Sequence, residues 1–490
     1  MADRDLRTWI AKLEKEGELR RITAKVNWDQ EIGEIIRKVC EQSGPALLFE
    51  NIKGHEKTWS RKLFTNGLGT RSRYNIMLGL PKDSSTADIV QTMRKRVKNP
   101  VPAKKVRTGP VKENIVKGKD IDLFQFPIPK WHPLDAGRYI NTYNGAVTRD
   151  PETGQLNVGI YRGMAAAKNK ITVLLVPMKD WGVSYKKYQQ MGKAMPVAFV
   201  YGWDPVLLTV AGVPYIGDEY ELAGAIRQQP VELVKCEMSD LEVPASAEIV
   251  VEGTISPDPD SYEAEGPFGE GSGYYGDPGT RPVVKVNCIT YRNDPIFRGT
   301  MVGSEAMDEL KMSSDVSMSS AIWDVLDSQE IPGIIDVNAG LLTVVKIHKT
   351  YQGQARQIAA ALWGSKYSGQ IQNAIMVVEE DVDIYNSGSL KAAFHDKVDF
   401  YRDLVVYPLL MGSPVDPSIS KDKRNELKYG IGVQNKLLID ATTDWEMYPM
   451  RPEWGNRRYP IRYEPAPETK KLVEKRWKEY GLHNLLCKEE

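Results

Sequence analysis

The sequence predicts a protein of several domains that mixes the α+β and α/β classes, and three observations lead to this fold class. The chain has 490 residues, which corresponds to about three domains. Short β-type runs between turn residues fill its middle, and strand-like and helix-like segments alternate in its last third. We therefore divide it into an N-terminal α/β domain (1–115), a central β domain (116–304), a C-terminal α/β domain (305–463) and a terminal helix (464–490).

The N-terminal domain is predicted to begin with an amphipathic helix. Apolar residues recur at helical spacing from Leu6 to Leu13, and Gly17 ends the pattern. Beyond it, the apolar run at 46–49 predicts a strand, and the stretch at 86–97 predicts a helix.

The central domain is predicted to be a barrel or a sandwich. It is entered through a proline-rich passage at 126–133, which we interpret as an extended connector because proline removes a donor and disfavours helix before it. Short β-type runs follow at 171–176, 247–251 and 283–286, separated by Gly, Pro and Asp. Many short strands with turn signals between them are typical of these two architectures.

The C-terminal domain is predicted to contain a parallel sheet. A strand at 342–347, a helix at 356–363 and a buried strand at 374–378 alternate along the chain. The stretch 468–480 is predicted to be a helix with apolar residues on one side, and a terminal helix of that kind often packs on a neighbour.

Charge and hydropathy exclude several classes of protein. The 65 basic and 65 acidic side chains give a formal net charge of +0, whereas nucleic-acid binders usually carry a basic excess. We find no apolar run long enough to span a bilayer and no apolar signal region at the start. We therefore expect neither a nucleic-acid partner nor a membrane partner.

The cysteines and histidines are few and scattered. The 4 cysteines form no CxxC pair, and this pattern is typical of a protein of the reducing cytoplasm. The 5 histidines form neither HxH nor HExxH, so a histidine-rich metal site is not expected.

The most informative segment for chemistry is 263–276, in which Glu265 and Glu270 flank a Gly-Pro-Phe-Gly turn. Glycines permit positive φ and close backbone approach, so the turn can direct both carboxylates toward one cavity. Burial there would raise one pKa and suit that group to proton transfer. Taken alone, the segment is more often a solvated acidic turn, because such turns are common.

Two further segments contain charged residues next to apolar ones. In 157–164, alternation along a strand would place Ile160 and Arg162 on one face, where an arginine needs an anionic partner such as a substrate carboxylate or a glutamate. In 217–226, an acidic helix start leads into an apolar helix. A surface arginine and simple compensation of the helix dipole are the alternatives.

Taken in order, these segments resemble the motifs of the UbiD family. The resemblance covers nearly the whole chain, and it also includes 126–129, 135–139, 377–383 and 439–443. It rests above all on Asn157-Val158-Gly159-Ile160-Tyr161-Arg162, Glu219-Tyr220-Glu221-Leu222-Ala223-Gly224-Ala225 and Glu265-Gly266-Pro267-Phe268-Gly269-Glu270.

The resemblance implies reversible, non-oxidative decarboxylation of an aromatic or α,β-unsaturated acid. It implies prenylated FMN, a divalent metal such as Mn²⁺, and often K⁺. It also implies a small N-terminal α/β part, a central split β-barrel that holds the flavin, and a C-terminal α/β domain used in oligomerisation. We expect a homodimer or homohexamer, and a flavin prenyltransferase that supplies the cofactor.

The same match implies roles for individual residues. Arg162 would bind the substrate carboxylate and pair with Glu265, and Glu270 would deliver the proton that replaces CO₂. Asn157 and Glu219 would ligate the metal. The remaining residues implied to contact the cofactor are Ile160, Tyr161, Leu174, Leu175 and Val176 along the flavin, and Lys366 at its phosphate.

One position departs from the family pattern. Many members place a histidine metal ligand shortly after the strand that ends near Val176, whereas this chain has Lys179 and Asp180 there. Asp180 could ligate a hard cation such as Mn²⁺ or Mg²⁺, since carboxylates suit those ions. Alternatively, the ammonium of Lys179 could neutralise the phosphate itself.

The substrate is expected to be a benzoate-type, hydroxybenzoate or heteroaromatic acid, with Gln370, Ile371 and a loop at 409–414 shaping its pocket. Three alternatives stay within enzymes: a decarboxylase of aryl-CoA acids, a decarboxylase of α,β-unsaturated acids, and a physiological carboxylase. A fourth alternative is a flavin-binding or assembly protein without activity.

Overall fold

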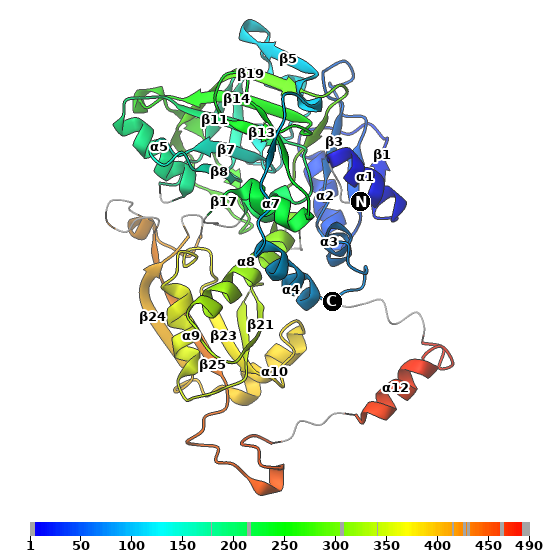
Figure 1. The fold of residues 1–490 in the computed structure, drawn as a ribbon, viewed down its shortest axis with the longest axis vertical. Helices are drawn as coiled ribbons and strands as arrows, with labels where there is room; N and C mark the ends of the chain where they lie inside the picture. Colours follow the sequence, from blue (N-terminus) through cyan, green and yellow to red (C-terminus); the bar gives the residue numbers. More distant parts are fainter. Residues whose placement is uncertain are drawn as a thin grey trace.

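A computed structural model of the 490-residue chain describes residues 5–177, 179–212, 217–303, 308–340, 342–413, 416–424, 428, 432–460 and 465–482. The predicted boundaries at 304/305 and 463/464 lie outside the described residues, so the division into domains stays a prediction. Figure 1 shows a large β-rich body with a smaller α/β layer beside it.

The N-terminal part begins with the predicted amphipathic helix. Asp5 caps α1, because its carboxylate accepts from Thr8 N while the Thr8 hydroxyl accepts from Asp5 N. The parallel pairing of β20 with β3 brings the end of the central part back to this sheet, whose strand order is β1-β2-β3-β20. The elements are α1 (Leu6–Lys15), β1 (Leu19–Ile22), α2 (Glu31–Glu41), β2 (Ala46–Phe49), β3 (Lys62–Thr65), α3 (Arg71–Leu78), α4 (Thr86–Val97) and β20 (Ile296–Arg298).

The central part is built on one curled sheet with the strand order β6-β9-β10-β19-β14-β11-β7-β8, to which β5 adds beside β19. Its elements are β4 (Lys104–Lys105), β5 (Asn114–Lys117), β6 (Tyr139–Asn141), β7 (Gly145–Arg149), β8 (Leu156–Gly159), β9 (Gly163–Ala167), β10 (Lys170–Val173), α5 (Asp180–Gln190), β11 (Met195–Tyr201), α6 (Leu207–Ala211), α7 (Glu219–Arg227), β12 (Glu232–Lys235), β13 (Glu242–Pro244), β14 (Ile249–Ile255), β15 (Glu263–Glu265), β16 (Phe268–Gly269), β17 (Tyr275–Gly276), β18 (Gly279–Arg281) and β19 (Val283–Tyr291).

Both faces of this sheet are buried. Because side chains alternate along a strand, Val200 and Val250 face a core that they share with α1, α6 and α7, whereas Phe199 and Val251 face a second core. The predicted strand at 171–176 is shorter in the structure, where β10 ends at Val173.

The C-terminal part contains the predicted parallel sheet. β22, β23 and β25 pair in parallel, and antiparallel β21 and β24 complete the order β21-β22-β23-β25-β24. The elements are α8 (Glu309–Ser328), β21 (Ile334–Asn338), β22 (Thr343–Ile347), α9 (Gln354–Trp363), β23 (Ala374–Glu379), α10 (Ser387–Lys397), β24 (Leu404–Met411), β25 (Val433–Ala441) and α12 (Pro467–Arg476). The six 3₁₀ turns that the description covers are η1 (Pro110–Lys112), η2 (Gly118–Asp120), η3 (Leu123–Gln125), η4 (Pro259–Ser261), η5 (Lys421–Arg424) and η6 (Pro452–Trp454).

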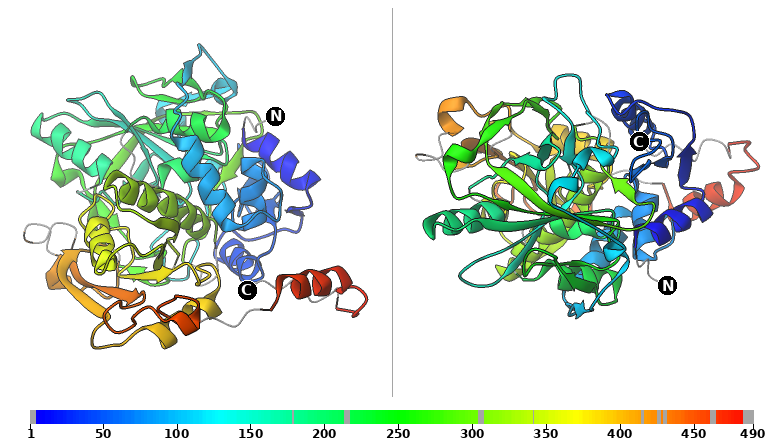
Figure 2. Two further views of the ribbon diagram at one scale, coloured as in Figure 1. Left: turned by 60° about the horizontal axis from the view of Figure 1, so that its bottom comes forward. Right: turned by 90° about the horizontal axis from the view of Figure 1, so that it is seen from above.

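Helices mark the junction and the end of the chain. α8 packs against α4, α6, α9 and β21, and it lies between the β-rich body and the C-terminal sheet (Figure 1). α12 has no buried residue and lies apart from the body in Figure 1 and in the left view of Figure 2. Within the described residues, no helix combines the length and the apolar character that crossing a membrane requires.

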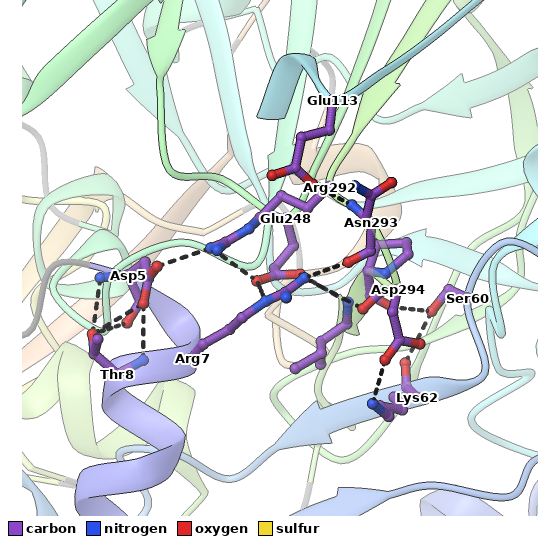
Figure 3. A network of polar contacts seen from close by, with 12 residues as sticks. Asp5, Arg7, Thr8, Ser60, Lys62, Glu113, Glu248, Arg292, Asn293 and Asp294 are labelled. Carbon is purple, nitrogen blue, oxygen red and sulfur yellow. Dashed lines mark hydrogen bonds and ion pairs between the residues drawn. The ribbon is translucent and has the colours of Figure 1, made fainter. Parts of the chain in front are cut away.

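A buried carboxylate joins α1 to the central sheet (Figure 3). Glu248, which is fully buried, precedes β14 and accepts from Arg7 at 2.7 and 2.9 Å and from Ile296 N at 3.0 Å. Arg292 lies 3.4 Å from the same carboxylate and 2.8 Å from Asp5. This network fixes α1 against the start of β14 and the end of β19.

Candidate active site

Arg162 lies on a link between two strands rather than within one. We expected residues 157–164 to form a single strand, but β8 ends at Gly159 and β9 begins at Gly163. β8 is at one edge of the curled sheet and β9 is next to the other edge. Residues 160–162 therefore cross the open side of the sheet, and this crossing places Arg162 at the mouth between the two edges.

Arg162 contacts both carboxylates of the predicted catalytic segment. Its Nη2 donates to Glu265 Oε2 at 2.8 Å, and its Nη1 donates to Glu270 Oε1. The three side chains are 9%, 0% and 12% exposed. Since a buried arginine requires an anionic partner, the structure accounts for the sequence expectation that Arg162 pairs with Glu265, and it adds Glu270 to the pair.

The turn between the two glutamates directs them toward one guanidinium. Glu265 ends β15, Gly266 has a φ of 84°, and β16 follows before Glu270. A Cβ on Gly276, which pairs with Phe268, would lie 2.9 Å from both Arg162 Nη1 and Glu270 Oε1. A side chain at that position would force one or both charged groups to shift from their observed contact.

Two aromatic residues, Tyr139 and Phe268, pack against the cluster of Arg162, Glu265 and Glu270. The Tyr139 hydroxyl donates to Glu265 Oε1 at 2.8 Å, and burial together with Glu265 raises the Tyr139 pKa. The Phe268 ring lies 5.6 Å from Arg162 Cζ, within the range of a cation–π contact, and 4.3 Å from the Tyr139 ring. No role for Tyr139 follows from the sequence alone, although the residue lies in the motif 135–139.

A His–Asp pair fixes the backbone of the same turn. The buried carboxylate of Asp135 accepts from Gly269 N at 2.9 Å and from His132 N at 2.9 Å, and it lies 3.3 Å from His132 Nδ1. Gly269 immediately precedes Glu270, so these bonds restrict where Glu270 can point.

A second cluster contains the residues implied to hold the metal and the phosphate. Asp180, at the start of α5, is a common electrostatic neighbour of Tyr161, Lys179, Glu219 and Lys366, because it affects the pKa of each. Lys366 follows α9, so the C-terminal part contributes to this cluster. Burial lowers the pKa of Lys179 and of Lys366, and Asp180 opposes that shift in both.

Glu219 shows that this second cluster fits a cation. It is 5% exposed, and its Oε2 is buried without a hydrogen-bond partner among the described residues. Burial raises its pKa to about 8, and Asp218 and Asp180 add to that effect. A bound cation would satisfy this oxygen and favour the ionised form, and carboxylate and amide oxygens are the ligands that Mn²⁺ and Mg²⁺ accept.

The other predicted ligand, Asn157, lies on β8 and contacts the Tyr161 hydroxyl. The Tyr161 ring stacks on Trp181 with centroids 4.0 Å apart. The described residues contain no group of three or more His, Cys, Asp or Glu side chains suited to a metal. The set available here is therefore two carboxylates and one amide.

The residues implied to line the flavin lie near Arg162. Ile160 and Tyr161 belong to the crossing link. Leu174, Leu175 and Val176 lie beyond the end of β10 and are half-buried, and Leu174 N donates to Arg162 O at 3.4 Å. Of the predicted pocket loop, residues 409–411 belong to strand β24 instead, and Pro414 lies outside the described residues.

Three family models match successive parts: the 3-octaprenyl-4-hydroxybenzoate carboxy-lyase N-terminal domain at 10–93, the Rift-related domain at 104–305 and the C-terminal domain at 312–441. A phenolic acid decarboxylase of Bacillus subtilis is 31% identical over 92% of this chain and 94% of its own.

Solved structures of two enzymes resemble all or nearly all of the chain. The closed form of vanillic acid decarboxylase from Sedimentibacter hydroxybenzoicus is 30% identical with a TM-score of 0.84, covering 100% of both chains. The UbiD-class enzyme HmfF from Pelotomaculum thermopropionicum, in complex with FMN, is 30% identical with a TM-score of 0.81, covering 96% of this chain and 99% of its own. An evolved dimeric form of HmfF, in complex with prFMN, is 28% identical with a TM-score of 0.79 over 96% and 98% of the two chains.

These matches cover the N-terminal, central and C-terminal parts in the order that the sequence motifs predicted. Together with the Arg162 cluster, they confirm the resemblance and the fold class. The chain belongs to the UbiD family of carboxy-lyases.

Proposed function

We propose that this chain catalyses the reversible, non-oxidative decarboxylation of an aromatic carboxylic acid with prenylated FMN as cofactor. The observation that carries the proposal is Arg162, whose guanidinium contacts Glu265 and Glu270 where all three side chains are almost fully buried. The vanillic and phenolic acid decarboxylases among the relatives support the reaction type, and the FMN and prFMN complexes of HmfF support the cofactor.

The reaction requires an electron sink that no side chain supplies. Loss of CO₂ from a ring carbon leaves an anion in the ring plane, and bound prenylated FMN would accept that electron density. Arg162 binds the substrate carboxylate through its planar fork. This competition frees Glu270 from its ion pair, so that its carboxylate takes up a proton from solvent and delivers that proton to the carbon that has lost CO₂. Glu265 stays beside Arg162 and orients it.

The second cluster would hold the phosphate end of the cofactor. Asn157, Glu219 and Asp180 would ligate Mn²⁺ or another divalent cation, with Lys179 as the alternative means of neutralising the phosphate. Lys366 would contact the phosphate from the C-terminal part. The flavin itself would lie along Ile160, Tyr161, Leu174, Leu175 and Val176. K⁺ binding and supply of the cofactor by a flavin prenyltransferase belong to the same proposal.

We also infer that the chain forms a homodimer or homohexamer through its C-terminal part. Large apolar side chains are exposed there, such as Tyr401 at 98% and Leu409 at 63%, and Leu472 of α12 at 51%. Exposed apolar patches on folded chains commonly mark protein interfaces.

The test is to produce the chain together with a flavin prenyltransferase and to measure CO₂ release from a panel of acids. The panel contains benzoates, hydroxybenzoates, heteroaromatic acids, aryl-CoA acids and cinnamates. We expect turnover of a ring carboxylic acid, and turnover of alkenyl acids alone would contradict that substrate class. A bound flavin without turnover of any acid would favour a flavin-binding protein without activity.

The proton donor is tested by Glu270→Gln in the same preparation. Removing a general acid lowers kcat by a factor of about 100 to 10,000, and we expect a loss in that range. Glu232→Gln is the control, because Glu232 of β12 forms an exposed ion pair with Lys104 and lies outside the Arg162 contacts. Near-normal turnover in Glu270→Gln would show that its role as donor is wrong.

A further inference from the structure

A second arginine lies close to the same carboxylate oxygen of Glu265 that Arg162 contacts. Arg281 ends β18, and its Nε lies 3.9 Å from Glu265 Oε2. The same Nε is buried and has no hydrogen-bond partner among the described residues, although the side chain as a whole is 32% exposed. An arginine donor left unpaired so close to a carboxylate requires an explanation.

The register of two short strands aims this arginine at Glu265. β15 and β18 pair antiparallel, with Glu263 opposite Arg281 and Glu265 opposite Gly279. Because residues two apart share a face, Arg281 and Glu265 are diagonal neighbours on one side of the ribbon. A Cβ on Gly279 would lie 3.2 Å from Arg281 Cζ, so the missing side chain leaves room for the guanidinium to lie across that position.

The acid directly opposite Arg281 is engaged elsewhere. Glu263 forms its ion pair with Lys170 of β10. Glu265 is therefore the carboxylate toward which Arg281 is directed. The charged or titratable groups that the described elements bring to Glu265 are Tyr139 from β6, Arg162 from the crossing link and Arg281 from β18.

We propose that Arg281 is a positioning residue that keeps Glu265 ionised and in place when Arg162 engages the substrate carboxylate. The inference rests on the proposed function, in which the substrate carboxylate competes with Glu265 and Glu270 for one guanidinium. Arg281 supplies a second cation that stays beside Glu265 during that exchange. Its free Nε closes onto Glu265 Oε2 when the bond from Arg162 lengthens.

The test is the pH dependence of kcat/KM in the holoenzyme of Arg281→Met. An opposite charge 3.9 Å away favours ionisation of a carboxyl group by about one pH unit when the cation is partly exposed. We therefore expect the acidic limb of the profile to move up by about one pH unit in this variant. Arg281→Lys keeps the cation, so it should recover most of that shift.

Lys285→Met is the matched control, because Lys285 is an exposed cation on the adjacent strand β19. It should leave the acidic limb where it is. An unmoved limb in Arg281→Met, an equal shift in Lys285→Met, or a uniform loss of activity with an unchanged profile would overturn the proposal.

A second measurement does not depend on turnover. Infrared titration of the full chain, with Glu265→Gln identifying the band, reports protonation of Glu265 directly. We expect the protonated band to appear at higher pH in Arg281→Met than in the parent, and coincident titrations would overturn the inference. Absence of CO₂ release from the parent holoenzyme would contradict the proposed function instead, and the infrared result would still decide the role of Arg281.

Discussion

Replacing Glu219 by Gln in the metal-free, cofactor-free chain should abolish a loss of stability that the parent shows as the pH rises. Glu219 is buried, its Oε2 lacks a partner, and burial raises its pKa to about 8 from the reference value of 4.5. Between these two values the native state holds a proton that the unfolded state has released. The contribution of the Glu219 proton to the free energy of unfolding is therefore fully present below about pH 4.5, and it is lost as the pH rises through 8.

The size of the effect follows from the two pKa values. Each pH unit of difference between the two pKa values corresponds to about 1.4 kcal/mol, so the whole interval amounts to on the order of 5 kcal/mol. Gln has no proton to lose, so Glu219→Gln should be flat over the same interval. We expect the variant to become more stable than the parent at pH 9, whereas the two differ little at pH 5.

The assay is denaturant unfolding in the presence of a chelator, at pH values between 5 and 9. Glu221→Gln is the control, because it changes a carboxylate in the same first turn of α7 that is only half-buried. Added Mn²⁺ should stabilise the parent more at pH 8 than at pH 6, since the metal requires the ionised carboxylate, and it should stabilise Glu219→Gln less. Parallel pH dependence of the parent and Glu219→Gln would refute the reasoning.

Two further substitutions test the packing around the site and the network at the start of the chain. Gly276→Ala places a methyl group 2.9 Å from Arg162 Nη1 and Glu270 Oε1, and we expect kcat to fall by on the order of 100-fold, since small displacements of catalytic groups have effects of that size. Gly271→Ala, whose new Cβ meets nothing nearer than 3.8 Å, should keep near-parental kcat, and equal losses would contradict this explanation. Glu248→Gln should lower the free energy of unfolding by about 2 kcal/mol or more, because it leaves two arginines around a neutral amide. Asp294→Asn, which breaks an exposed pair with Lys62, should lower it by less than about 1 kcal/mol; denaturant unfolding measures both, and an equal change would show that burial is not the cause.

Local patterns were sufficient to predict the helices that begin at Leu6, Thr86 and Glu219 and the parallel core of the C-terminal sheet. In each case the signal is contained in a short stretch: apolar spacing, a capping residue, or an apolar run followed by a polar strand end. The order of the motifs then led to the predicted pairing of Arg162 with Glu265, and the structure has this ion pair.

The break at 160–162 could not be predicted in the same way. No proline interrupts this stretch, and β-type residues such as Val158, Ile160 and Tyr161 run through it as they would in one strand. The chain leaves β8 because the strand that follows, β9, pairs with β10 at the far side of the curled sheet. That choice of partner depends on how the whole sheet closes around a core, and it cannot be predicted from a short stretch of sequence. Tyr139 was missed for the same reason, since its place beside Glu265 depends on β6 pairing with β9.

The position of Arg281 depends on register rather than on any motif. Glu265 and Arg281 are sixteen residues apart in sequence, and only the pairing of Glu265 with Gly279 makes them diagonal neighbours. A shift of one residue would turn Arg281 to the other face of the ribbon, away from Glu265, while leaving the sequence motif intact. The glycine at 279 and the ion pair of Glu263 with Lys170 both favour the observed register. The chemistry of Glu265 is therefore set by a strand pairing that lies outside the segment from which its role was first inferred.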